Sequence, residues 1–156
     1  MLAAFAKEES QPGPKLLIAA EPDRMRDSLH LLLKTARGIH IVGLADDSSV
    51  ALRMVSEHRP ALVLLDTNLL GEEMPTVLKK VKAKESQSRC LVLTDTFEQQ
   101  REAGSAGADA ALVKGFSIEK LFQTIEELLQ DGQSRSRVRR SASGERIGQD
   151  FFTTDR

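Results

Sequence analysis

The feature that most constrains the fold of this chain is a series of five short apolar runs, spaced almost evenly along the sequence. Each run is continuous and rich in Leu, Val and Ile, which is typical of strands that are covered on both faces. The runs are Leu16 to Ala20, Ile39 to Ala45, Ala61 to Leu65, Cys90 to Thr94 and Ala110 to Val113. They predict the strands of a buried, parallel sheet.

A helical signal follows each run. The expected helix starts are Pro22, Asp46 or Asp47, Pro75, Phe97 and Ser117. The last of these helices carries the strongest apolar stripe, which ends at Leu128 and Leu129. Five strands that alternate with five helices predict an α/β fold with right-handed crossovers and a doubly wound, five-stranded parallel sheet.

The length and composition fit one folded domain with polar ends. The chain has 156 residues, of which 40% are hydrophobic, and this suffices for a single core. We expect residues 1–14 to be a flexible leader, residues 15–131 to be the domain, and residues 132–156 to be a basic, disordered tail. With 22 basic and 23 acidic residues, the charge balance does not favour a nucleic acid or a membrane as partner. Only weak electrostatic contact of the arginine-rich tail with nucleic acid is expected.

The cysteine content and the lengths of the apolar segments indicate where in the cell the protein is located. Cys90 is the single cysteine and lies in an apolar run, so it is expected to be a buried hydrophobic residue and not a disulfide partner. Met1 to Ala6 is too short for the core of a signal peptide, and no stretch approaches the roughly 20 apolar residues of a spanning helix. These features predict a cytoplasmic protein.

Polar residues stand at the ends of three predicted strands. Asp66 follows the third run, Thr94 ends the fourth, and Lys114 follows the fifth. In doubly wound sheets the site lies in the crevice beyond the carboxyl ends of the strands, so these side chains are expected to meet there. Together they can hold a phosphoryl group, with Asp66 as acceptor, Thr94 as hydrogen-bond donor and Lys114 as the neutralising charge.

With these residues in this order, the chain resembles the receiver domain of bacterial response regulators over about residues 15–131. The segment from Gly107 to Lys114 is especially similar to the fifth strand of that family. The resemblance implies a flavodoxin-like receiver architecture. It also implies a role in a two-component phosphorelay, in which a histidine kinase phosphorylates Asp66 with the help of Mg²⁺.

The metal-binding half of the family pattern is missing. Receivers carry two acids after the first strand, and with Pro22 as the anchor the matching positions are Ala19 and Ala20. Asp66, a backbone carbonyl near Asn68 and water should bind Mg²⁺ weakly at most, because Mg²⁺ requires octahedral oxygen ligands. Glu21 is the nearby acid, either in reach of the crevice or facing solvent in the first helical turn.

The switch half of the pattern is also altered, which makes the chain an atypical receiver. The family has an aromatic residue three positions before the lysine, where this chain has Ala111. Asp95 follows Thr94 in place of a small residue, and it can repel phosphate and pair with Lys114, or lie in the N-cap region of the fourth helix.

These residues also have a structural interpretation. Asp66 can be a solvated acid at a strand end, and Thr94 and Lys114 can simply satisfy its hydrogen-bonding capacity. The three histidines share no metal-like spacing, and no residue is predicted to be catalytic.

The sequence therefore predicts a pseudo-receiver that acts by binding a protein partner or a second copy and is not an enzyme. The association face is expected to comprise the fourth helix, fifth strand and fifth helix, where the apolar stripe ends at Leu128 and Leu129. One alternative is a functional phosphoacceptor, with a histidine kinase as partner. Another is a small-ligand-binding module that uses the altered crevice.

Overall fold

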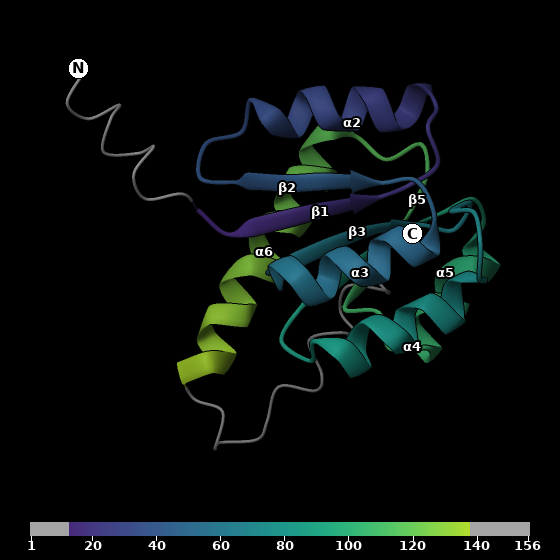
Figure 1. Cartoon of the computed structure of the whole chain (residues 1–156). Coiled ribbons are helices and arrows are strands. Elements are labelled where there is room, and N and C mark those ends of the chain that lie inside the picture. Colours follow the sequence, from purple (N-terminus) through teal and green to yellow (C-terminus); the bar gives the residue numbers. More distant parts are fainter. Residues whose placement is uncertain (1–12, 138–156) are drawn as a thin grey trace.

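Five parallel strands form one sheet in the order β2-β1-β3-β4-β5 in the computed structural model, which describes residues 13–137 (Figure 1). The strands are β1 (Lys15–Ala19), β2 (His40–Ala45), β3 (Leu62–Asp66), β4 (Arg89–Thr94) and β5 (Ala110–Val113). The helices are α2 (Arg24–Lys34), α3 (Ser48–His58), α4 (Met74–Lys84), α5 (Phe97–Ser105) and α6 (Ile118–Arg137). The predicted fold class is confirmed.

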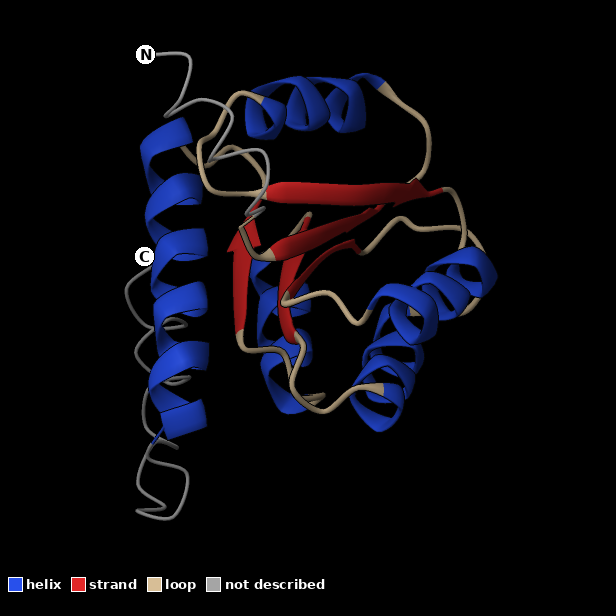
Figure 2. Cartoon of the chain, turned by 60° about the vertical axis from the view of Figure 1, so that its left-hand side comes forward, coloured by secondary structure: helices blue, strands red, loops and turns tan. Residues whose placement is uncertain are grey.

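The sheet lies between two layers of helices, as Figures 1 and 2 show. Successive strand residues point to opposite faces, so each strand contributes to two cores. Leu16 and Ile18 pack with residues of α2 and α6, whereas Leu17 and Ala19 pack with residues of α3, α4 and α5. Burial on both faces explains why the strands appear in the sequence as continuous apolar runs.

The helix starts agree with the sequence in part. The prediction for Pro22 is wrong, because α2 begins at Arg24 and Asp23 is its N-cap, where the side chain accepts a hydrogen bond from the backbone of Arg26 at 2.8 Å. Of the two alternatives for α3, Asp47 is the cap. Pro75 lies in the first turn of α4, where its missing N–H costs no helical hydrogen bond.

Helix α6 is longer than expected. Its predicted apolar stripe is buried at Leu121, Ile125 and Leu128. The backbone remains helical to Arg137 and so passes the domain boundary expected at residue 131. The leader through residue 12 and the tail from residue 138 lie outside the described residues. Within residues 13–137, no helix is long and apolar enough to span a membrane.

Candidate functional site

Asp66 is a buried carboxylate at the carboxyl end of β3. Its residue is 2% exposed, although it sits where the strand leaves the core. The Oδ1 atom accepts a hydrogen bond from the backbone N–H of Asn68 at 2.8 Å and another from Lys114 Nζ at 3.0 Å. The structural interpretation of Asp66 as a solvated acid is wrong, because this carboxylate is enclosed and held by two donors.

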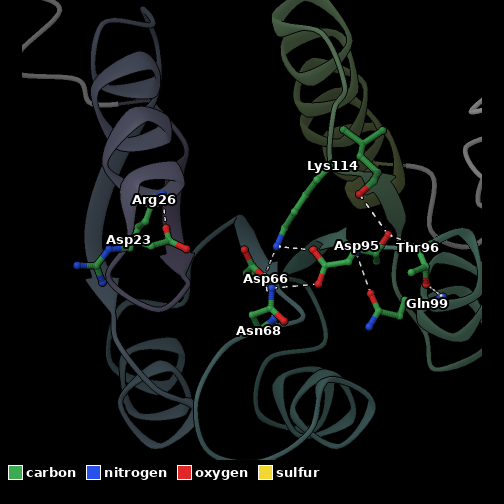
Figure 3. Close-up of polar contacts among 10 residues, drawn as sticks. Asp23, Arg26, Asp66, Asn68, Asp95, Thr96, Gln99 and Lys114 are labelled. Atoms are coloured by element: carbon green, nitrogen blue, oxygen red, sulfur yellow. Dashed lines mark hydrogen bonds and ion pairs between the residues drawn. The ribbon is translucent and has the colours of Figure 1, made fainter.

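Lys114 lies between two carboxylates. Its Nζ atom is 3.0 Å from Asp66 Oδ1 and also 3.0 Å from Asp95 Oδ1. The ion pair between Asp95 and Lys114 that the sequence suggested is therefore present. Asp95 Oδ2 in turn accepts a hydrogen bond from the side chain of Asn68 at 3.0 Å, which closes a ring of four residues (Figure 3).

The charges in this ring perturb each other. The pKa of Asp95 is held below its ordinary value, chiefly because Lys114 donates a hydrogen bond to it. Burial by itself would lower the pKa of Lys114, but its hydrogen bonds to Asp66 and Asp95 together outweigh burial and raise that pKa. The ring therefore sets a single ammonium group against two acidic side chains.

The hydroxyl of Thr94 takes no part in this ring. Thr94 is fully buried, and its Oγ1 lies 3.1 Å from the carbonyl oxygen of Thr96 and 3.5 Å from that of Leu112. The backbone of Thr94 does reach the site, because its carbonyl accepts a hydrogen bond from the N–H of Lys114 at 2.8 Å. The structure thus brings Asp66 and Lys114 together and directs the Thr94 side chain to the backbone.

The orientation of Asp95 follows from the cap of α5. The N-cap is Thr96, and Asp95 directly precedes it, so Asp95 lies in the N-cap region as the second alternative predicted and also pairs with Lys114 as the first did. Thr96 Oγ1 accepts from the N–H of Gln99 at 3.0 Å, and the Gln99 side chain accepts from the N–H of Asp95 at 2.8 Å. This reciprocal arrangement resembles a capping box and leaves the Asp95 carboxylate free to pair with Lys114.

The strand register decides which residues at the end of β1 lie beside Asp66. Ala19 pairs with Leu65 of β3, so the next pair along the two strands is Ala20 and Asp66. Because side chains alternate, Ala19 faces the core under α3, α4 and α5, whereas Ala20 belongs to the opposite cluster. The register therefore favours Ala20, followed by the half-buried Glu21, over Ala19 as the positions that flank Asp66.

Sequence reasoning missed a cation on this side of the crevice. The guanidinium of Arg26 donates to the carbonyl oxygen of Ala20 at 3.2 Å and pairs with Asp46. Its Nε atom is buried without a hydrogen-bond partner. Arg26 lies in the first turn of α2, and this position in the sequence could have indicated that its side chain reaches the end of β1. In Figure 3, Arg26 and Asp23 lie apart from the ring around Lys114.

Ala111 lies at the centre of the core. It is fully buried in β5, and its carbonyl accepts a hydrogen bond from the side chain of Gln100 at 2.8 Å. The methyl group belongs to the cluster that includes Val92 and Ala103. There is therefore no aromatic ring at this position to move between inward and outward orientations.

The side chains present at the crevice do not fit Mg²⁺. Within residues 13–137, no three His, Cys, Asp or Glu side chains are grouped so that they could hold a metal ion. Mg²⁺ requires six oxygen ligands in octahedral geometry, and an ammonium group already lies between the two carboxylates that face each other. This donor set suits a cationic side chain and not a hard divalent ion.

Known proteins share this architecture. The model of the response regulator receiver domain matches residues 16–126. The sensory transduction protein LytT of Bacillus cereus is 28% identical over 134 residues, which make up 83% of this chain and 53% of LytT. The chemotaxis protein CheY of Bacillus subtilis is 26% identical over 117 residues, or 74% of this chain and 97% of CheY.

The fold agrees with these relatives. A CheY-like receiver domain protein from Methanospirillum hungatei superposes with a TM-score of 0.71 at 22% identity, covering 79% of this chain and 98% of the other. The chain spans about half the length of LytT and of several other curated relatives. The parallel sheet, the paired Asp66 and Lys114, and the match over residues 16–126 lead to one conclusion: the chain belongs to the response regulator receiver domain family of two-component signalling.

Proposed function

We propose that this chain is a pseudo-receiver, which acts by binding a protein partner and in which Mg²⁺-dependent phosphorylation of Asp66 is absent or much weakened. The observation that carries the proposal is the position of Lys114, whose ammonium group bridges Asp66 and Asp95 at 3.0 Å each. An incoming phosphoryl group would compete with Asp95 for Lys114 and would meet the negative charge of Asp95. No catalytic turnover is assigned to the chain.

The donor set at the end of β1 supports the same proposal. Ala20 supplies no carboxylate beside Asp66, and Glu21 makes no hydrogen bond or ion pair within residues 13–137. Within residues 13–137, Lys114 is the cationic side chain paired with Asp66, so without a metal ion it would carry most of the balance of charge for a phosphoryl group there. Phosphoryl transfer depends on such charge balance, so its rate should be low.

The competing proposal is a functional phosphoacceptor with a histidine kinase as partner. It is favoured by one observation, the contact of Lys114 with the buried Asp66, which holds that side chain in place. Receiver domains interact with histidine kinases in two-component systems, so the two proposals share a partner class and differ in the chemistry at Asp66.

Calorimetric titration of the full chain with Mg²⁺ separates them. The pseudo-receiver proposal predicts no heat of binding at millimolar metal, and no mass increase when the chain is incubated with acetyl phosphate and Mg²⁺. The Asp66→Asn variant is the matched control, because it keeps the size of the side chain. Binding or a mass increase that disappears in Asp66→Asn would overturn the pseudo-receiver proposal in favour of the phosphoacceptor.

The register also indicates how a metal site could be rebuilt. Ala20→Asp places a carboxylate beside Asp66 and next to Glu21, and Asp95→Ala frees Lys114. We expect the double variant to gain Mg²⁺ binding. Ala19→Asp is the matched control, since it adds the same charge to the opposite, fully buried face and should not create a site.

A protein partner is most simply placed near the exposed apolar side chains. Leu128 is fully buried and Leu129 is half-buried, so the end of the apolar stripe of α6 is incompletely covered only at Leu129. Phe97 at the start of α5 and Ile118 at the start of α6 are instead 54% and 55% exposed. We place the association surface at these two side chains, on the same two helices that the sequence suggested.

Sedimentation velocity over a range of concentrations tests this surface. Phe97→Ser with Ile118→Ser should abolish a dimer, or the capture of a partner, that the natural chain shows. Leu31→Ser on α2 is the matched control, because Leu31 is 65% exposed but lies elsewhere. A loss of association caused equally by the control would contradict the placement.

A further inference from the structure

A groove with an apolar floor lies between α6 and the loop that joins α2 to β2. Its volume is about 270 Å³, and its lining combines the apolar residues Ala36, Ile39, Phe122, Ile125 and Leu129 with Arg37, Glu126 and Gln130. Figure 2 shows this loop beside α6. Ile39, Phe122 and Leu129 are only partly buried, although they pack on the core. The groove therefore exposes hydrophobic surface that one or two large side chains could cover.

The described chain begins at the edge of this groove. A Cβ atom on Gly13 would lie 1.9 Å from the carbonyl oxygen of Gly38, which lines the groove. The next residue, Pro14, accepts a hydrogen bond from the N–H of His40 at 2.9 Å. These contacts fix the point from which the preceding residues leave the domain.

The twelve residues before Gly13 lie outside the described part of the structure, and their sequence has two parts. Met1 to Ala6 is wholly apolar and includes Leu2 and Phe5, whereas Lys7 to Pro12 is polar apart from its proline. Phe5 is eight residues from Gly13, a distance that an extended chain can span over about 26 Å. The polar part is therefore long enough to act as a linker between the domain and the apolar part.

We propose that the apolar segment Met1–Ala6 folds back onto its own domain and that Leu2 and Phe5 occupy the groove beside α6. The groove matches this segment in chemistry, and its edge is where the segment is attached. A short tether gives a high effective concentration, so the segment reaches the groove before a free partner does. The docked segment covers the partly buried side chains of Ile39, Phe122 and Leu129.

The other apolar segment of the chain is placed less well. Phe151 and Phe152 lie in the tail, and α6 first carries the chain about 10 Å from Gln130 to Arg137. Thirteen further residues separate Arg137 from Phe151. This longer tether lowers the effective concentration of Phe151 and Phe152 at the groove.

The neighbouring hollow is a poor alternative for the apolar segment. It measures about 430 Å³ and includes the cationic residues Lys15, Arg59 and Arg89 in its lining. Each of these side chains has a partner in the fold: Lys15 donates to the carbonyl of His58, Arg59 lies 3.9 Å from Glu85, and Arg89 pairs with acidic residues. Burying leucine and phenylalanine among these charges would desolvate them, which disfavours this hollow.

A nitroxide spin label at Ala4→Cys in the full chain tests the proposal. The natural Cys90 is fully buried, so the label attaches only at the new cysteine. We expect the methyl NMR signals of Ile39 and Leu129 in the groove to broaden, while those of Leu52 on α3 stay sharp. Phe5→Ser should abolish the broadening without affecting the fold, whereas the matched control Phe152→Ser should leave it unchanged.

Several results would overturn the proposal. One is the absence of selective broadening at Ile39 and Leu129. Another is broadening of these signals by a label at Thr153→Cys, which would assign the groove to the tail. A third concerns mixtures of spin-labelled chains without isotope label and isotope-labelled chains without spin label. Broadening in such a mixture, and none within a single chain, would mean that the segment of a second copy occupies the groove. None of these outcomes depends on whether Asp66 is phosphorylated.

Discussion

The two ion pairs of Lys114 should differ several-fold in their contribution to stability, although their distances are equal. Lys114 Nζ is 3.0 Å from a carboxylate oxygen in each pair, but the Asp66 side chain is 2% exposed and that of Asp95 is 42% exposed. We compare Lys114→Met, which leaves Asp66 without its cation, with Asp95→Asn, which removes only the exposed charge. The two variants therefore separate the effect of burial from that of distance.

The magnitudes follow from burial. At 3.0 Å the Coulomb attraction is about 5 kcal/mol for an effective dielectric constant of about 20, before the cost of desolvation. Removing one partner of a buried pair costs about 3–5 kcal/mol, and because Lys114 is partly exposed we expect a loss of about 3 kcal/mol for Lys114→Met. An exposed pair contributes about 0.2–1 kcal/mol, so Asp95→Asn should cost about 0.5 kcal/mol.

The dependence on pH provides a second test. The pKa of Asp95 is lowered in the fold, so its contribution is present above the unfolded value near 3.9 and is lost as the pH falls through the lowered folded value.

Urea unfolding followed by circular dichroism measures these free energies, since the chain has neither tryptophan nor tyrosine for fluorescence. Equal losses in the two variants would refute the reasoning, because burial would then not control the contribution of each pair.

Three further predictions concern the rest of the domain. Gly71 has a φ of 104°, and a Cβ atom there would lie 2.3 Å from Ser48 Oγ, so Gly71→Ala should lower the free energy of unfolding by about 1–3 kcal/mol in urea. Burial raises the pKa of the Cys90 thiol to about 12, so alkylation at pH 8, followed by mass spectrometry, should be slow in the native protein and fast in urea. Asp131 lies 3.5 Å from the buried Arg89, and Asp131→Asn should cost about 1 kcal/mol in thermal or urea unfolding; no loss would mean that this contact does not hold α6.

The fold and the residues of the crevice could be predicted because they depend on regular patterns. Continuous apolar runs separated by helical segments admit few arrangements, and parallel strands bring their carboxyl ends to one edge. Asp66 and Lys114 were therefore expected to meet from their positions after the third and fifth strands, and they do. The apolar stripe of α6 predicted the burial of Leu121 and Ile125 in the same way.

The predictions that were wrong concern side-chain contacts and strand pairing in the folded chain, which a sequence pattern does not specify. Thr94 lies at the expected strand end, but its hydroxyl turns to backbone carbonyls that only the folded chain supplies. Pro22 and Asp23 both suit a helix start, and the fold selects Asp23 as the cap. The sequence also could not show that Ala19 pairs with Leu65 and so faces away from Asp66. That depends on the strand register, and a shift of one residue would turn each side chain to the opposite face of the sheet.

The two changes in the crevice, an alanine beside Asp66 and a carboxylate at Asp95, are electrostatically related. A receiver with two acids beside its phosphoacceptor carries an excess of negative charge that a metal ion must balance. Here Lys114 faces two carboxylates, and the excess is a single charge without any metal. A phosphoryl group would add about 1.5–2 negative charges, and it would compete with Asp95 for Lys114. On the pseudo-receiver proposal, Asp95 stabilises the unmodified crevice and opposes phosphorylation through the same ion pair, so substituting it should weaken the first effect and relieve the second together.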